Sequence, residues 1–286
     1  MDLGIGADTR VVVQGMTGRQ GSFHTKAMLE YGTNIVAGVT PGKGGGYVAD
    51  IPVYDSIGEV DGGVDASILF VPPRFTKDAV LEALEHSLNP IVVVTEGVPV
   101  FDSMGFVNKA RGKNIMVVGP NTPGLIRPGH IKLGIMPNKI FTPGNVAVVS
   151  RSGTLTYEVV AQLTARGVGQ SMAVGLGGDP VVGLGYIDLL EMLKKDEDTE
   201  SVVLIGEIGG EAEEKAARYL KETEYPKPVY AYIVGKSAPE GKRMGHAGAI
   251  VSGGSGTYDS KIKSLSCANV DVAESPSHLV DLITGE

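Results

Sequence analysis

One histidine lies in a segment built largely from small residues near the end of the chain. His246 occurs in GKRMGHAGAIVSGGSGTYDS, residues 241–260, next to Gly245, Ala247 and Gly248. An imidazole nitrogen is nucleophilic at neutral pH without a metal, so this segment could bring the ring to a phosphoryl group. A structural histidine with satisfied hydrogen bonds is the alternative, and the segment alone leaves both interpretations open.

A carboxylate that could assist His246 follows an apolar strand. Glu207 comes directly after VVLIG, and open α/β sheets place their sites at the carboxyl ends of strands. It could accept the second ring N–H and orient the imidazole, or it could be an ordinary loop residue. Nearby acids, Glu211, Glu213 and Glu214, fit a helix N-terminus instead. The remaining histidines show no ligand spacing, so we assign no metal: His24, His86, His130 and His278.

A short turn in the second half of the chain could bind an anion. In VVSRSGTLTYEVVAQL a buried strand leads through Ser152, Gly153 and Thr154 into an amphipathic helix. The free N–H groups of the first turn and the positive end of the helix dipole attract negative charge. The simpler interpretation is an N-cap that only starts the helix.

A glycine turn near the N-terminus indicates a second ligand site. QGMTGRQG, residues 14–21, follows the strand RVVVQ and precedes a helix, but its GxxGxxG spacing lacks the middle glycine of GxGxxG. After the second strand, Lys43 and glycines stand where NAD enzymes have an acid. This favours a ligand with a phosphate on its ribose, NADP or coenzyme A. A tight turn with a solvated Lys43 is the alternative.

Composition and charge narrow the classes of function. The 286 residues are 42% hydrophobic and 20% charged, which fits a globular protein, and 41 glycines indicate many close backbone approaches. A net charge of -8 argues against nucleic-acid and anionic-membrane partners. Cys267 is the single cysteine, so no internal disulfide forms, and no signal-peptide or membrane-spanning pattern occurs. We therefore expect a cytoplasmic protein.

The order of predicted elements indicates two α/β domains. Short β-rich runs alternate with helical segments from residue 10 onward, and the alternation restarts at residue 145. Proline and glycine dominate the stretch between them. We predict a Rossmann-like domain at 1–121, a linker at 122–143 and a second doubly wound domain at 144–286.

Eight motifs together closely resemble the α subunits of succinyl-CoA synthetases. In chain order they are QGMTGRQGSFH, GVTPGKGG, VTEG, GPNTPG, SRSGTLTYE, GLGGDP, IGEIGG and GKRMGHAGAI. The resemblance covers almost the whole chain and implies a CoA-binding Rossmann-like domain followed by a flavodoxin-like ligase domain.

The resemblance also implies roles for single residues. His246 would be phosphorylated and Glu207 would hold it, while Ser152, Gly153 and Thr154 would form one of two helix N-termini that clamp the phosphohistidine. Tyr157 would lie near the acyl substrate. Contacts to coenzyme A would fall on Thr17, Gly18, Arg19, Gln20, Lys43, Val94, Thr95 and Glu96.

The implied reaction is a phosphohistidine relay between two subunits. Phosphate converts succinyl-CoA to succinyl phosphate and CoA, His246 takes the phosphoryl group, and its glycine-rich loop carries it to a nucleoside diphosphate on the partner. An ATP-grasp-type β subunit would supply Mg²⁺ and the site for ATP or GTP, because this sequence has no GxxxxGK[ST] motif.

Two departures from the family pattern and two rival functions remain. Thr122 stands where many relatives have cysteine, so a thiol there is not needed, and Arg74 stands where they often have a small residue or proline.

Another acid–CoA ligase of the superfamily, such as a malate–CoA ligase, is the nearer rival. The further one is a non-catalytic protein that senses CoA or a nucleotide.

Overall fold

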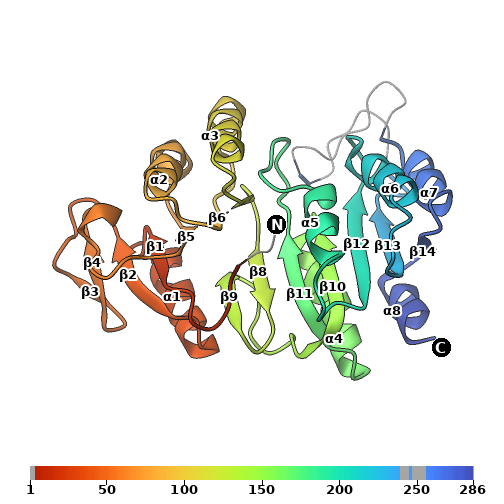
Figure 1. Cartoon of the computed structure of the whole chain (residues 1–286), viewed down its shortest axis with the longest axis horizontal. Helices are drawn as coiled ribbons and strands as arrows, with labels where there is room; N and C mark the ends of the chain where they lie inside the picture. The colour runs from red at the N-terminus through yellow and green to blue at the C-terminus, as the bar shows by residue number, and fades with distance from the viewer. Residues whose placement is uncertain (1–3, 239–244, 247–255, 286) are drawn as a thin grey trace. The chain divides into compact units, whose positions relative to one another are not determined.

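The computed structural model describes residues 4–238, 245–246 and 256–285 (Figure 1). The chain divides into two compact units. The N-terminal unit contains Leu3–Asn138 and Val181–Leu184, and the C-terminal unit contains Lys139–Pro180 and Gly185–Glu286. No helix among these described residues is long and apolar enough to cross a membrane.

The N-terminal unit is a Rossmann-type sheet. Its strand order is β3-β4-β2-β1-β5-β6-β7. All neighbours are parallel except β3 and β4. Numbered along the chain, the six parallel strands follow the order 3-2-1-4-5-6 of dinucleotide-binding folds. The strands are β1 (Val11–Gln14), β2 (Ile35–Val39), β3 (Tyr47–Val48), β4 (Ile51–Tyr54), β5 (Ala66–Leu69), β6 (Ile91–Val93) and β7 (Val117–Val118).

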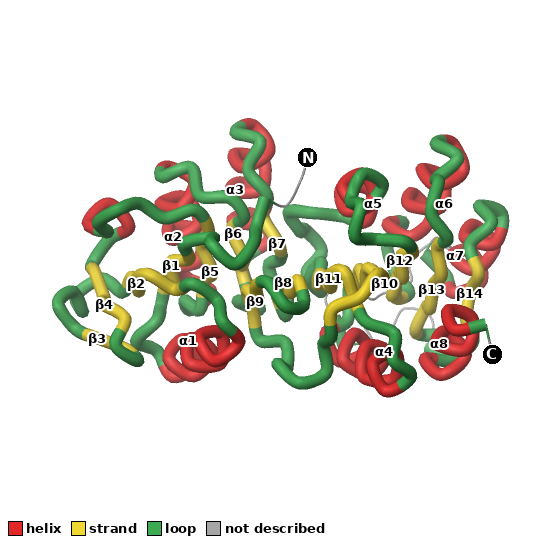
Figure 2. Tube along the Cα trace, turned by 60° about the horizontal axis from the view of Figure 1, so that its bottom comes forward, coloured by secondary structure: helices red, strands yellow, loops and turns green. Residues whose placement is uncertain are grey.

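Helices cover both faces of this sheet. In Figure 2, α1 lies on one face and α2 and α3 lie on the other. The central strands are therefore buried on both faces and read as unbroken apolar runs, as in the VVVQ of β1. The helices are α1 (Arg19–Tyr31), α2 (Pro73–Glu85), α3 (Val100–Gly112) and the short 3-10 turn η1 (Ile57–Glu59).

The C-terminal unit is also doubly wound. Its own strands have the order β14-β13-β12-β10-β11, all parallel, which is the 2-1-3-4-5 order of flavodoxin-like folds. The fold class predicted from the sequence is thus confirmed. The strands are β10 (Pro143–Ser150), β11 (Gln170–Gly175), β12 (Ser201–Glu207), β13 (Val229–Val234) and β14 (Asp271–Ala273).

Five helices flank this second sheet. Figure 2 shows α4 and α8 on one face and α5, α6 and α7 on the other. Their bounds are α4 (Gly153–Ala165), α5 (Tyr186–Leu193), α6 (Ala212–Glu222), α7 (Tyr258–Ser266) and α8 (Pro276–Thr284). Strands β11 and β12 pair with β10 on opposite sides, so the strand order reverses at β10. The carboxyl ends of β10 and β12 therefore form the switch point, where such folds bind ligands.

Several elements differ in detail from the sequence prediction. The stretch at 122–143 contains an antiparallel hairpin, β8 (Gly124–Arg127) and β9 (Ile131–Gly134), within the N-terminal unit. Close strand approach explains its glycines, because a Cβ on Gly124 would lie 2.0 Å from the Leu133 carbonyl oxygen.

Candidate active site

The first glycine turn packs as a ligand-binding turn does. Gly15 has φ +81°, and a Cβ there would lie 2.8 Å from the Phe70 carbonyl oxygen. A Cβ on Gly21 would lie 2.2 Å from the Gly15 carbonyl oxygen, so α1 can approach the turn only with glycine at this position. Gly18 is the N-cap of α1 and has no side chain to cap the first-turn N–H groups. Backbone donors of this kind at a helix N-terminus can bind an anion.

A cavity of about 740 Å³ opens beside this turn, at the switch point of the N-terminal sheet. Of the residues predicted to contact coenzyme A, Thr17 and Gly18 line it. Its wall also includes Pro41, Phe70 and Phe75, which the sequence analysis did not single out. A large cavity with apolar walls beside uncapped backbone donors suits a ligand that has both a flat ring and phosphates.

The other predicted CoA contacts lie around this cavity without lining it. Arg19 and Gln20 are exposed on the first turn of α1. Thr95 follows β6 with Val94 and Glu96, and its hydroxyl donates to the carbonyl of Val71, a lining residue, at 2.7 Å.

Asp55 holds the loop that carries Lys43. Its Oδ1 accepts the backbone N–H groups of Lys43 at 2.9 Å and Gly44 at 2.8 Å. The hydrogen bond from Gly44 leads the causes that lower the pKa of the Asp55 carboxyl, so it stays ionised near neutral pH. This fixes the backbone of the loop and leaves the Lys43 side chain exposed.

In the C-terminal unit, the structure brings His246 and Glu207 within hydrogen-bond distance. The ring Nδ1 lies 2.7 Å from Glu207 Oε2. The Glu207 side chain is 7% exposed and that of His246 is 32% exposed. Glu207 is the last residue of β12, so the pair sits at the switch point of this sheet. The rest of the predicted carrier segment, residues 239–244 and 247–255, lies outside the described residues.

An arginine and a glycine that the sequence analysis did not assign also lie at the His246 site. Arg151 Nε lies 3.4 Å from Glu207 Oε1, and Arg151 Nη2 donates to the Asp179 carbonyl at 3.2 Å. Arg151 therefore links the carboxylate to the loop that contains Gly178. A Cβ on Gly178 would lie 2.7 Å from His246 Cγ and Cδ2, so the ring rests against bare backbone.

The predicted anion-binding turn begins two residues after β10. Ser152 is the N-cap of α4, and its hydroxyl accepts the Leu155 N–H at 3.3 Å. Gly153 and Thr154 open the helix, where first-turn N–H groups have no intrahelical acceptor. Tyr157 lies one turn further, and burial raises its pKa to about 12, so the phenol is neutral. Ser152 therefore caps the helix, and the same turn retains backbone N–H groups that could bind an anion.

A buried charge cluster supports Glu207 from behind. The backbone N–H of Glu207 donates to Glu213 Oε1 at 3.3 Å. Glu213 is only 2% exposed and pairs with the fully buried ammonium of Lys261, which also contacts Glu214 at 3.0 Å and the Gly210 carbonyl at 3.1 Å. The sequence analysis correctly placed Glu213 in the first turn of α6. It missed the ion pair, because Lys261 is distant in the sequence.

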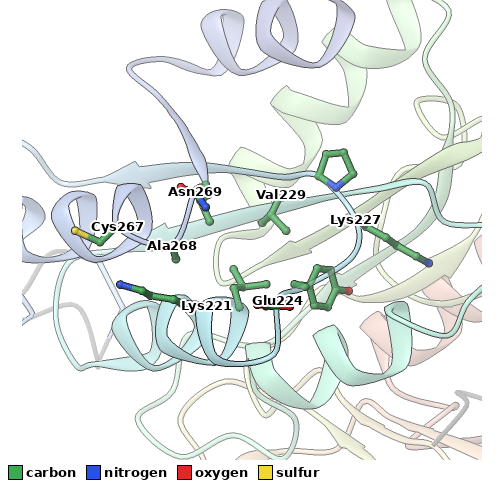
Figure 3. Close-up of a pocket in the computed structure, with 11 residues that line it drawn as sticks. Lys221, Glu224, Lys227, Val229, Cys267, Ala268 and Asn269 are labelled. Carbon is green, nitrogen blue, oxygen red and sulfur yellow. The ribbon is translucent and has the colours of Figure 1, made fainter.

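A second cavity lies at the opposite end of the C-terminal sheet. It has about 530 Å³, and Figure 3 shows Lys221, Glu224, Lys227 and Asn269 on its wall. Val229, at the amino end of β13, lines it and pairs with Val202, whereas Glu207 pairs with Val234. This cavity is therefore separate from the His246 site.

Protein-family models match segments of both units. A CoA binding domain model matches residues 7–97, and a CoA-ligase model matches residues 149–270. Succinate–CoA ligase [ADP-forming] subunit alpha from Methanothermobacter thermautotrophicus is 57% identical over 281 residues, 98% of this chain and 95% of that protein. Subunit alpha 1 from Archaeoglobus fulgidus is 52% identical over 99% of this chain and 97% of its own length.

A solved structure shares the fold. ATP citrate lyase from Methanothrix soehngenii, in complex with citrate and coenzyme A, superimposes with a TM-score of 0.88 at 24% identity. The match covers 98% of this chain and 51% of that one, so this chain spans about half of the lyase. The sequence matches over nearly the full length confirm the resemblance carried by the motifs, and the chain belongs to the family of succinate–CoA ligase α subunits.

Proposed function

We propose that this chain carries the phosphoryl group of an acid–CoA ligase on His246, with succinate as the acid. The observation that carries the proposal is the 2.7 Å contact between His246 Nδ1 and the buried Glu207 carboxylate at a sheet switch point. A carboxylate held in this way fixes the orientation and tautomer of an imidazole.

The contact favours Nε2 as the reacting nitrogen. When Nδ1–H donates to Glu207, the ring lone pair lies on Nε2, which is then the nucleophile. Arg151 Nε lies 3.4 Å from the other carboxylate oxygen and places a positive charge beside Glu207. As Nε2 bonds to phosphorus, the ring gains positive charge, which the Glu207 carboxylate stabilises.

The proposed reaction has three steps. An oxygen of inorganic phosphate attacks the thioester carbon of succinyl-CoA, the C–S bond breaks, and CoA leaves as a thiolate that takes the proton released by the attacking phosphate. His246 Nε2 then attacks the phosphorus of succinyl phosphate, and succinate leaves with the bridging oxygen. A terminal oxygen of the nucleoside diphosphate finally takes the phosphoryl group from Nε2.

Coenzyme A would bind in the N-terminal cavity. The helix end at Gly18 and the exposed Lys43 suit its phosphates, and the apolar walls suit its adenine ring. Arg19, Gln20, Val94, Thr95 and Glu96 complete the proposed contacts, and Tyr157 would face the acyl group.

The nucleotide and Mg²⁺ would bind to a partner β subunit of the ATP-grasp type. The names of the relatives, subunit alpha, support a partner. Among the described residues no group of three or more His, Cys, Asp and Glu side chains could hold a metal ion. The helix end at Ser152, Gly153 and Thr154 would stabilise the phosphohistidine from this chain's side.

A labelling experiment tests the relay. The chain, purified with its partner, is incubated with γ-labelled ATP or GTP, and we expect a label that acid removes and base does not. The variant His246→Asn should take none. A wild-type complex that stays unlabelled would instead favour a sensor of CoA or nucleotide. Comparing turnover with succinate and with malate then separates the two acid–CoA ligases.

A further inference from the structure

Gly178 is the feature of the His246 site that family membership leaves without a role. It lies three residues after β11, in the loop GLGGDP. Its φ is outside the left-handed region, so the backbone conformation does not itself require glycine. The position is buried, and the group that fills the space beside its Cα is the imidazole of His246.

The contact leaves no room for a side chain while His246 is held by Glu207. A Cβ on Gly178 would lie 2.7 Å from ring atoms Cγ and Cδ2 and 3.0 Å from Nε2. These distances fall short of van der Waals contact by about 0.7 Å or less. The atoms that a side chain here would displace belong to the ring whose Nδ1 lies 2.7 Å from Glu207 Oε2.

Glu207, which contacts the same ring, is also held in place. Arg151 contacts Glu207 and donates to the carbonyl of Asp179, the residue after Gly178. The carboxylate and the glycine backbone are thus held relative to each other through one guanidinium. The imidazole fits the slot between them only because Gly178 has no side chain.

We infer that Gly178 is a positioning residue that selects the docked state of His246, the state in which Glu207 orients the ring. The inference rests on the proposed phosphoryl relay. A methyl group at this position disfavours the docked ring and leaves unaffected any state in which His246 has left the slot. In the relay, the phosphoryl group passes between His246 and the acyl substrate in the docked state. It passes between His246 and the nucleotide on the partner in the state in which His246 has left the slot.

The test measures the two half-reactions separately in the complex with the partner subunit. In the first, γ-labelled ATP phosphorylates His246, and in the second, succinate and CoA discharge the label. We expect Gly178→Ala to phosphorylate within about twofold of wild type and to discharge at least about tenfold more slowly. Gly178→Val should discharge more slowly still.

Gly185→Ala is the matched control in the same connection, because a Cβ there would meet only Asp188 Oδ2 at 3.6 Å. It should behave as wild type in both half-reactions. Discharge by Gly178→Ala at the wild-type rate, or an equal loss in both half-reactions, would overturn the inference.

A second measurement does not depend on turnover. A hydrogen bond from Nδ1–H to a carboxylate gives a downfield proton resonance, which His246→Asn identifies by its loss. We expect this resonance in wild type and Gly185→Ala, and its loss in Gly178→Ala. If the wild type takes no label but shows the resonance, the proposed relay fails, and the comparison with Gly178→Ala still tests the docking role of Gly178. An unchanged resonance in Gly178→Ala refutes the docking role and leaves the relay standing.

Discussion

Replacing Glu207 by Gln separates the charge of this residue from its shape. Glu207 uses one carboxylate oxygen on His246 and the other on Arg151, at 2.7 Å and 3.4 Å. Glutamine keeps one carbonyl oxygen that can accept from the His246 Nδ1–H, and its NH₂ group then faces Arg151, with which Glu207 Oε1 makes an ion pair and no hydrogen bond. The variant therefore loses at least one contact and all of the negative charge.

The size of the effect follows from the burial of the site. A hydrogen bond to a charged group contributes about 1.5 to 3 kcal/mol, and a neutral one contributes about 1 kcal/mol. The difference, of the order of 1.4 kcal/mol, slows phosphoryl transfer through His246 about tenfold. Glu207→Ala removes both contacts and leaves the Arg151 guanidinium, 13% exposed, without its carboxylate. We expect a further loss there, roughly 3 kcal/mol in total, or about 150-fold.

Quenched single-turnover labelling from γ-labelled ATP, followed by discharge with succinate and CoA, measures both steps. Glu211→Gln is the matched control, since that side chain is 57% exposed and its ion pair within the described part of the chain is with Lys215 at the surface. The expected order of discharge rates is wild type and Glu211→Gln, then Glu207→Gln, then Glu207→Ala. Wild-type discharge in Glu207→Gln would refute the orienting role of the charge.

Two further predictions concern the N-terminal unit. Lys43→Glu should weaken the binding of CoA more than that of dephospho-CoA in calorimetric titration, because the lysine is expected to face the ribose phosphate; equal losses would remove that role. Lys132 is buried, and desolvation lowers its pKa to about 8, so the folded chain loses this proton below the pH at which the unfolded chain does. The free energy of unfolding of wild type should therefore rise relative to Lys132→Met between about pH 8 and 10.5, by roughly 3 kcal/mol at most; a difference that stays flat in urea titrations across this range would contradict it.

The sequence predicted those parts of the fold whose signals are local. Apolar runs such as VVVQ and the glycine turn that follows it identified the central strand and its helix, because burial on both faces leaves no alternation to misread. The two-residue strand Tyr47–Val48 is too short for any pattern. The hairpin β8–β9 was obscured because glycine and proline in it indicate both loops and close strand approach.

Some residues of the candidate site could be predicted from local sequence signals, and others could not. Glu207 was identifiable because it ends an apolar strand, and His246 because small residues surround it. Arg151 was not, since its value depends on a contact with Glu207, 56 positions along the chain. Gly178 was quoted within a motif, but a glycine does not reveal in sequence which group approaches its Cα.

The cluster around Lys261 has its main consequence at Glu207. Burying an ammonium with 0% exposure carries a large desolvation cost, so ion pairs of this kind contribute little net stability. What the cluster fixes is geometry, because Glu213 accepts the backbone N–H of Glu207 while Lys261 binds Glu213, Glu214 and the Gly210 carbonyl. The carboxylate that orients His246 is therefore held from two directions, at its side chain by Arg151 and at its backbone by Glu213. With this carboxylate fixed, the space that a side chain at Gly178 would occupy has to be taken from the imidazole itself.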